Sequence, residues 1–154
     1  MPTSAGRARV LAGLVIAIAA VALTVHTAAA LGGGYLNVMS GIWLTLGRDL
    51  AGGVFYRDLL SDAGYGGTRY FPLFFALIAL GLRAGASLLA AGWLASAVAA
   101  VALIAGMFRL VRGLGGGRWL AGVFAAAAVA PYFVQQTLFE MRADVLAAAL
   151  NVWG

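Results

Sequence analysis

The chain has 154 residues, of which 64% are hydrophobic and only 10% are charged, so it has too few charges to cover a water-facing surface and is predicted to be an integral membrane protein. The absence of cysteine and the presence of a single histidine exclude a disulfide framework and a clustered Cys/His zinc site. The net charge of +5 comes from arginines without lysine, and no basic stripe is interleaved with aromatic residues, so the charge pattern disfavours nucleic-acid binding.

The first uncharged stretch, residues 10–31, predicts a transmembrane helix, because about 20 apolar residues cover the hydrocarbon core of a bilayer. Arg7 and Arg9 precede it, which places the N-terminus in the cytoplasm. Cleavage as a signal peptide near Ala30 is the less favoured alternative, since the apolar core is longer than a signal sequence needs. His26 lies inside the span, where a neutral imidazole bonded to a neighbouring helix is favoured over a functional site.

Residues 32–84 are predicted to form an external loop with two short helices. The first is an amphipathic helix, stopped by Gly52, that is expected to lie on the membrane surface. The second, Tyr70–Leu82, has 13 uncharged residues that cover only about 20 Å, so it is predicted to be interfacial or re-entrant. In the amphipathic helix, the apolar face is Tyr35, Met39, Ile42, Leu46 and Leu50, and the polar face is Asn37, Ser40, Thr45 and Arg48.

Two further uncharged stretches predict spans at residues 85–108 and 119–138, with Pro131 as their only breaker. Another span starts at about residue 143 and is cut short at the end of the sequence, so the chain is expected to be an N-terminal fragment. The predicted fold class is therefore all-α. It is a single transmembrane helical bundle, residues 1–154, with three full spans and a truncated fourth.

The distribution of charge predicts the orientation of the chain. Three arginines bracket the turn at Gly113–Gly117 without an accompanying acid, so this turn is expected to share the cytoplasmic side with the N-terminus. An even number of crossings then separates the two, which is why Tyr70–Leu82 is not counted as a span. All five acids fall on the external face. Arginine without lysine, with abundant alanine and glycine, points to a GC-rich bacterial genome and hence to the bacterial inner membrane.

The external loop supplies a first set of candidate site residues. Asp58 lies just outside the membrane, where a carboxylate at the mouth of a low-dielectric cavity can act as a general base. The alternative is a solvated acid paired with Arg57 or Arg69, and spacing alone does not decide between them. Tyr65, Arg69 and Tyr70 could stack on a sugar or clamp a phosphate, or they could form an interfacial aromatic belt with a snorkelling arginine.

The end of the third predicted span supplies a second set. Glu140, Arg142 and Asp144 form the pattern Glu-x-Arg-x-Asp, in which two carboxylates and a guanidinium could bind a cation or hold a phosphate through the arginine. The structural alternative is favoured on these residues alone, because acids suit helix N-termini and charges end a span.

Both sets lie in segments that resemble a known family. Residues 52–58, which end in Tyr-Arg-Asp, and residues 64–75 (GYGGTRYFPLFF) resemble the first external loop of polytopic GT-C glycosyltransferases, of the protein-mannosyltransferase-like and ArnT-like kind. Residues 130–133 (APYF) and 140–147 (EMRADVLA) resemble the end of their third span and their second external loop.

The resemblance implies an inverting transferase that moves a sugar from a polyprenyl-phosphate donor to an acceptor on the outer face. An aspartate of the first external loop, here Asp58 or Asp49, would act as the base, and arginines would stabilise the departing phosphate. The family's acid just after the first span is absent, since residues 34–37 read Gly-Tyr-Leu-Asn. The bilayer and the lipid-linked sugar are the expected partners, no cofactor is expected, and a divalent metal is left open without a specific motif for it. The chain alone is expected to be inactive.

The alternative is a non-enzymatic membrane subunit, or part of a transporter or flippase. A transporter is expected to show polar or broken helices near the middle of the membrane. The predicted spans are rich in alanine, leucine and valine, with one proline, and this favours the transferase.

Overall fold

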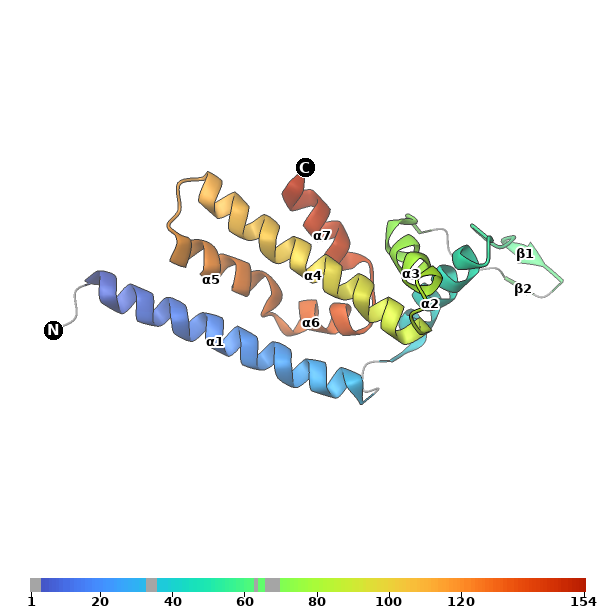
Figure 1. Ribbon diagram of the computed structural model, residues 1–154, viewed down its shortest axis with the longest axis horizontal. Helices are drawn as coiled ribbons and strands as arrows, with labels where there is room; N and C mark the ends of the chain where they lie inside the picture. Colours follow the sequence, from blue (N-terminus) through green and yellow to red (C-terminus); the bar gives the residue numbers. More distant parts are fainter. Residues whose placement is uncertain (1–3, 33–35, 63, 66–69) are drawn as a thin grey trace.

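The computed structural model describes residues 4–32, 36–62, 64–65 and 70–154 (Figure 1). Within these ranges the chain is helical apart from one small hairpin, so the predicted all-α class is confirmed. In the hairpin, which was not predicted, Leu60 pairs with Tyr65 and Ser61 with Gly64 in antiparallel register. The elements in chain order are α1 (Ser4–Leu31), α2 (Val38–Ala51), β1 (Leu60–Ser61), β2 (Gly64–Tyr65), α3 (Leu73–Arg83), α4 (Leu88–Gly113), α5 (Arg118–Val129), α6 (Tyr132–Phe139) and α7 (Asp144–Trp153).

Among the described residues, two helices are long and apolar enough to cross a membrane, and they correspond to the first two predicted spans. One is Gly6–Ala30 within α1, and the other is α4. Helix α4 is central and packs against α2, α3, α5, α6 and α7, whereas α1 packs against α5 and α6. Most of the surface of α1 is exposed and apolar, which suits contact with lipid. Helix α4 also runs past residue 108, so Arg109 and Arg112 lie in its last turns.

The third predicted span is not one straight helix. Helices α5 and α6 meet at an angle of 62°, with the break at Pro131. Proline has no N–H to donate and its ring clashes with the preceding turn, so the helix of α5 cannot run through it. Around α6 the side chains of Gln135, Thr137 and Glu140 are buried. The structure therefore does not show the third predicted span, residues 119–138, as a single straight helix. The pair forms either one broken span or a re-entrant segment.

Helix α2 begins at Asn37, whose side-chain Oδ1 accepts hydrogen bonds from the backbone N–H groups of Met39 (2.9 Å) and Ser40 (3.1 Å). Such N-caps satisfy donors that have no partner in the first turn of a helix. One side of α2 packs along α3, with Trp43 and Gly47 in the contact. Ser40 was predicted to lie on the polar face of this helix, but it is buried. Its hydroxyl donates a hydrogen bond to the carbonyl oxygen of Glu140 at 2.9 Å, which satisfies the buried polar group.

Helix α3 is the short apolar helix expected near residues 70–82. Its 11 residues begin after Pro72, a position where proline's missing N–H costs little. At about 1.5 Å per residue it covers about 16 Å, roughly half of the hydrocarbon core of a bilayer. Its buried side chains, Phe74, Phe75 and Ile78, lie in the core between α2 and α4.

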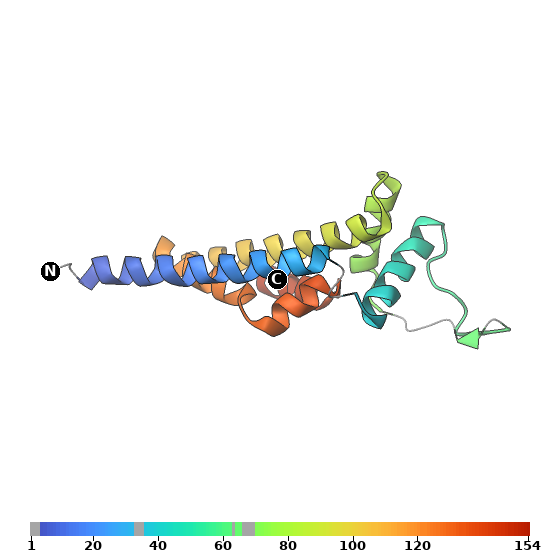
Figure 2. The same ribbon diagram turned by 90° about the horizontal axis from the view of Figure 1, so that it is seen from below.

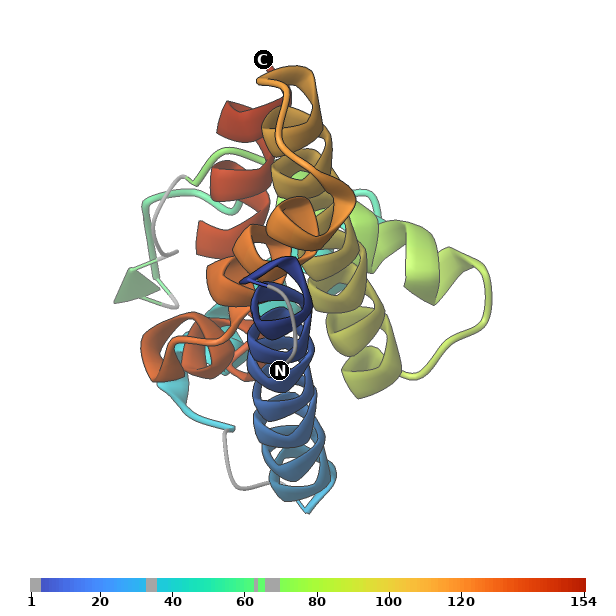
Figure 3. The ribbon, with the colours of Figure 1, turned by 90° about the vertical axis from the view of Figure 1, so that its left-hand side faces the viewer.

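The arginines that lack acidic neighbours in the sequence gather at one end of the molecule. Figures 1 and 2 show the start of α1 and the α4–α5 turn at the same end, with α2, α3 and the hairpin at the other. Figure 3 looks onto this end, which we call the arginine end. It carries Arg7, Arg9, Arg109, Arg112 and Arg118, while α1, α4 and α5 contain no acid. The start of α1 and the turn at 113–117 therefore lie at the same end of the molecule, an arrangement that is compatible with the predicted shared side of the membrane.

Candidate functional site

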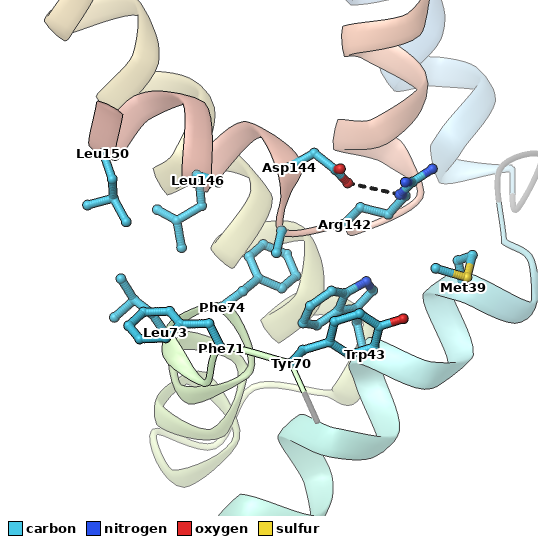
Figure 4. A pocket seen from close by; sticks show the side chains of 12 residues that line it. Met39, Trp43, Tyr70, Phe71, Leu73, Phe74, Arg142, Asp144, Leu146 and Leu150 are labelled. Carbon is cyan, nitrogen blue, oxygen red and sulfur yellow. Dashed lines mark ion pairs between the residues drawn. The ribbon is translucent and has the colours of Figure 1, made fainter. Parts of the chain in front are cut away.

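An open pocket of about 350 Å³ lies where α2, α3 and the start of α7 meet (Figure 4). We call it the α2–α7 pocket. Its wall is mostly apolar, and its charged side is formed by Arg142 and Asp144. The remaining lining side chains are Met39, Trp43, Tyr70, Phe71, Leu73, Phe74, Ala143, Leu146, Ala147 and Leu150.

Three aromatic rings pack against one another in the pocket wall. The ring centroids of Trp43 and Tyr70 are 4.6 Å apart, and the Trp43 and Phe74 rings meet edge to face at 5.5 Å. Trp43 and Phe74 are buried, so these rings are held by packing on both helices. Aromatic pairs at such distances contribute about 0.5–1.5 kcal/mol beyond the area that they bury. These contacts stabilise the arrangement of the three rings in the wall.

A three-residue ion cluster occupies the charged side. The Nε of Arg142 lies 2.9 Å from Oδ2 of Asp144, and its Nη1 lies 3.7 Å from Oε2 of Glu140. Glu140 is almost fully buried, and its Oε1 accepts a hydrogen bond from the side-chain amide of Gln136 at 2.9 Å. Asp144 is half exposed, so it is the member of the cluster that can most easily be displaced by an anionic ligand.

The cluster is fixed in place by Met141, which lies between two of its members. Met141 is fully buried and has a positive φ of 54°, a conformation that costs free energy for a non-glycine residue. Its sulfur occupies the space that a side chain on Gly92 of α4 would need, since a Cβ there would lie 2.4 Å from it. Together with the Ser40 hydrogen bond, this contact locks the segment after α6 against α2 and α4.

In the first external loop, Arg57 pairs with Asp49 rather than with Asp58. The two join through two hydrogen bonds of 2.7 Å, from Nε to Oδ2 and from Nη2 to Oδ1. The hydrogen bond to Asp49, and then the negative charge of that carboxylate, raise the pKa of the Arg57 guanidinium above its usual value. Asp58 is exposed. The hydroxyl of Tyr56 donates to the carbonyl oxygen of Tyr70, which ties this loop to the edge of the pocket.

The structure brings together part of the predicted site. Tyr70, Arg142 and Asp144 line the α2–α7 pocket, and Glu140 lies behind Arg142. Three predicted residues lie outside the pocket lining: Asp49, Arg57 and Asp58. Arg69 and the side chain of Tyr65 lie outside the described part of the chain. Sequence reasoning missed Ser40, Trp43 and Gly92, whose contacts with the site come from distant segments and leave no local pattern.

No protein-family model, curated protein or solved structure matches the chain. The ligand class of the α2–α7 pocket is therefore inferred from the residues that line it. In the described ranges, no group of three or more histidine or acidic side chains could hold a metal ion. An apolar wall beside a guanidinium suits an amphiphile with an anionic head, because the fork of N–H donors matches phosphate oxygens.

Proposed function

We propose that this chain takes part in the transfer of a sugar from a polyprenyl-phosphate donor, and that the α2–α7 pocket receives the phosphate end of that lipid. One observation carries the proposal: a single pocket is lined by both segments that resemble GT-C transferases. Tyr70 and Phe71 come from the first segment, and Arg142 and Asp144 come from the second. The two segments are about 70 residues apart in the sequence, so their meeting does not follow from local structure.

The proposed roles follow from the pairings of each side chain. The donor phosphate takes the place of the half-exposed Asp144 on Arg142, while the buried Glu140 keeps the guanidinium oriented. Asp58 acts as the base, because it is exposed, whereas both oxygens of Asp49 already accept hydrogen bonds from Arg57. Asp49 then positions Arg57, which stays more than half exposed and within reach of a substrate.

The donor-binding role of Arg142 has a direct test. We expect Arg142→Ala to weaken binding of polyprenyl phosphate by about 10- to 100-fold, since hydrogen bonds to a charged group are among the stronger polar contacts. Binding is measured on the purified protein in detergent, by thermal stabilisation as lipid is added. Arg142→Lys keeps the charge but loses the fork, so its loss should be smaller.

The matched control is Arg48→Ala, which removes the same charge from an exposed site on α2 outside the pocket. It should bind like the wild type. Equal affinity of Arg142→Ala and wild type for polyprenyl phosphate would remove the site from the proposed function.

The proposal also places the arginine end in the cytoplasm of a bacterium and the α2–α7 pocket on the outer side of the inner membrane. The support is the set of five arginines at the arginine end, because an excess of basic residues beside membrane spans is typical of cytoplasmic flanks. Single cysteines at Gly115 and Ser61 test it. A membrane-impermeant thiol reagent applied to intact inner membranes should label position 61 and leave position 115 unlabelled until the membrane is opened. The reverse pattern would contradict the orientation.

Transport of a solute or lipid is a second candidate function, favoured by the break between α5 and α6. The predicted spans, with Pro131 as their only breaker, favoured the transferase, but the structure bends by 62° at this proline, between α5 and α6. Broken helices with buried polar side chains, here Gln135, Thr137 and Glu140, are typical of transporter sites. Flux of a labelled solute or lipid across liposomes that contain the protein, with unchanged polyprenyl-phosphate affinity in Arg142→Ala, would favour transport over transfer.

A further inference from the structure

A second pocket, of about 310 Å³, lies at the arginine end, between the last turns of α4 and the end of α7. It shares no lining residue with the α2–α7 pocket, although α7 contributes to both. Its wall combines one charged side chain, Arg109, with the ring of Trp153 and with apolar side chains of Leu110, Leu114 and Val152. We call it the Arg109 pocket.

The indole of Trp153 builds this pocket. Its Nε1 donates a hydrogen bond to the carbonyl oxygen of Ala102 at 2.8 Å, which ties the end of α7 to α4. The ring fits there because Gly106 has no side chain, since a Cβ at that position would lie 2.8 Å from Nε1. The guanidinium carbon of Arg109 lies 5.2 Å from the centre of the same ring, a distance typical of a cation–π contact.

Arg109 is held without a counter-charge. No carboxylate of the described residues lies within ion-pair distance of it, and its neighbours at this end repeat the pattern. Arg112 donates to the carbonyl oxygen of Gly116 at 2.9 Å, and Arg118 lies over the ring of Trp119 at 5.7 Å. Three positive charges are thus fixed by rings and a carbonyl group, and the region attracts an anion.

Two ordinary roles explain part of this arrangement. Cations near the C-terminal end of α4 interact favourably with the helix dipole, and arginines beside a span orient it. Any exposed basic side chain at this position can fill both roles, whatever its contacts. Neither requires that Arg109 be stacked on the indole of Trp153 beside a pocket with an apolar side.

We infer that the Arg109 pocket binds an anionic phospholipid, with the phosphate on Arg109 and the glycerol and upper acyl carbons against Leu110, Leu114 and Val152. The mixed wall favours a lipid over a soluble anion, because a free phosphate would leave the exposed apolar side chains in water. The pocket also sits at the end of α4, a helix long enough to cross a membrane, and so at the depth of the headgroups. Charged headgroups bind basic pockets of this kind between membrane helices.

The test uses the purified protein in mixed micelles that contain phosphatidylglycerol, phosphatidylcholine or neither. Phosphatidylglycerol should raise the unfolding temperature in a concentration-dependent way, because a ligand that binds only the folded state stabilises it. We expect Arg109→Gln to weaken the affinity for phosphatidylglycerol about fivefold, as is typical for one arginine near an anionic lipid surface. Arg48→Gln removes the same charge from the opposite end and should retain wild-type affinity.

Arg109→Lys is the second variant. It keeps the positive charge but removes the planar guanidinium, so it separates the effect of charge from the effect of hydrogen-bond geometry and ring stacking. It should bind phosphatidylglycerol with an affinity between those of Arg109→Gln and the wild type. Three results would overturn the inference: equal loss in the Arg109→Gln and Arg48→Gln variants, equal stabilisation by phosphatidylcholine, or equal stabilisation by inorganic phosphate. The last would assign the pocket to a soluble anion. None of these readouts depends on the transferase proposal.

Discussion

Replacing Asp58 with asparagine is expected to lower the rate of sugar transfer by about 10²–10⁴-fold, the usual effect of losing a positioned general base. Asparagine keeps the shape of the side chain but cannot accept the proton of the acceptor hydroxyl. The exposure of Asp58 means that the substitution disturbs no packing, so protein levels in the membrane should stay unchanged. Transfer from polyprenyl-phosphate sugars is measured in membranes of cells that express the complete reading frame, at matched protein levels.

Asp49→Asn is the informative comparison, because it removes the partner of Arg57 without removing the proposed base. It should raise KM more than it lowers kcat, since it acts on the position of Arg57. If Asp58→Asn keeps wild-type turnover while Asp49→Asn abolishes it, the base is assigned to the wrong residue. If neither variant loses activity, the transferase proposal itself fails.

The second large effect concerns stability, at the contact between α2 and α3. We expect Gly47→Ala to destabilise the protein by about 1–3 kcal/mol, the usual cost of overpacking. A Cβ at this position would lie 2.4 Å from Cγ2 and 2.7 Å from Cβ of Ile78. Ile78 is fully buried and its Cβ is fixed to the backbone, so the two helices must move apart. Unfolding of the purified protein in detergent is measured by the loss of its near-ultraviolet circular dichroism signal.

Gly41→Ala is the matched control on the same helix. A Cβ at Gly41 meets no atom within 4 Å, so only the helix propensity changes. Alanine is favoured over glycine inside a helix by about 0.5–1 kcal/mol, so this variant should be more stable than the wild type. Equal destabilisation by both substitutions would show that α2 does not approach α3 as closely as described.

The long apolar helices were predictable because their signal is local. Residues 10–31 and 85–108 are mostly apolar and contain no acid, lysine or arginine, and such a stretch has few structures other than a helix of membrane length. Pro131 was identified as a breaker, but the 62° bend between α5 and α6 was not predicted, because Gln135, Gln136 and Thr137 carry no charge and the stretch still reads as one span. The position of the start of α1 and the α4–α5 turn at the same end of the molecule agrees with the charge pattern, because both segments carry arginines without acids.

The candidate site was only partly predictable, because its geometry depends on distant contacts. The Glu-x-Arg-x-Asp pattern correctly marks a charged cluster, and Tyr70 does lie beside it. The burial of Ser40 depends on a carbonyl group 100 residues away, which helical periodicity cannot report. The partner of Arg57 was missed for the same reason, since Asp49 lies on the preceding helix and reaches it only after the chain has turned.

The shortness of α5 and α6 affects the order in which the helices are expected to insert into the membrane. Helix α5 has 12 residues, which cover about 18 Å and leave it too short to enter the bilayer by its own hydrophobicity. It packs between α1 and α4, the two helices that are long enough to insert alone. We therefore expect α1 and α4 to insert first, and α5 and α6 to insert afterwards by packing against them. A substitution that slows integration of α1 should thus leave the Glu140 segment outside the membrane, even though the two are more than 100 residues apart in the sequence.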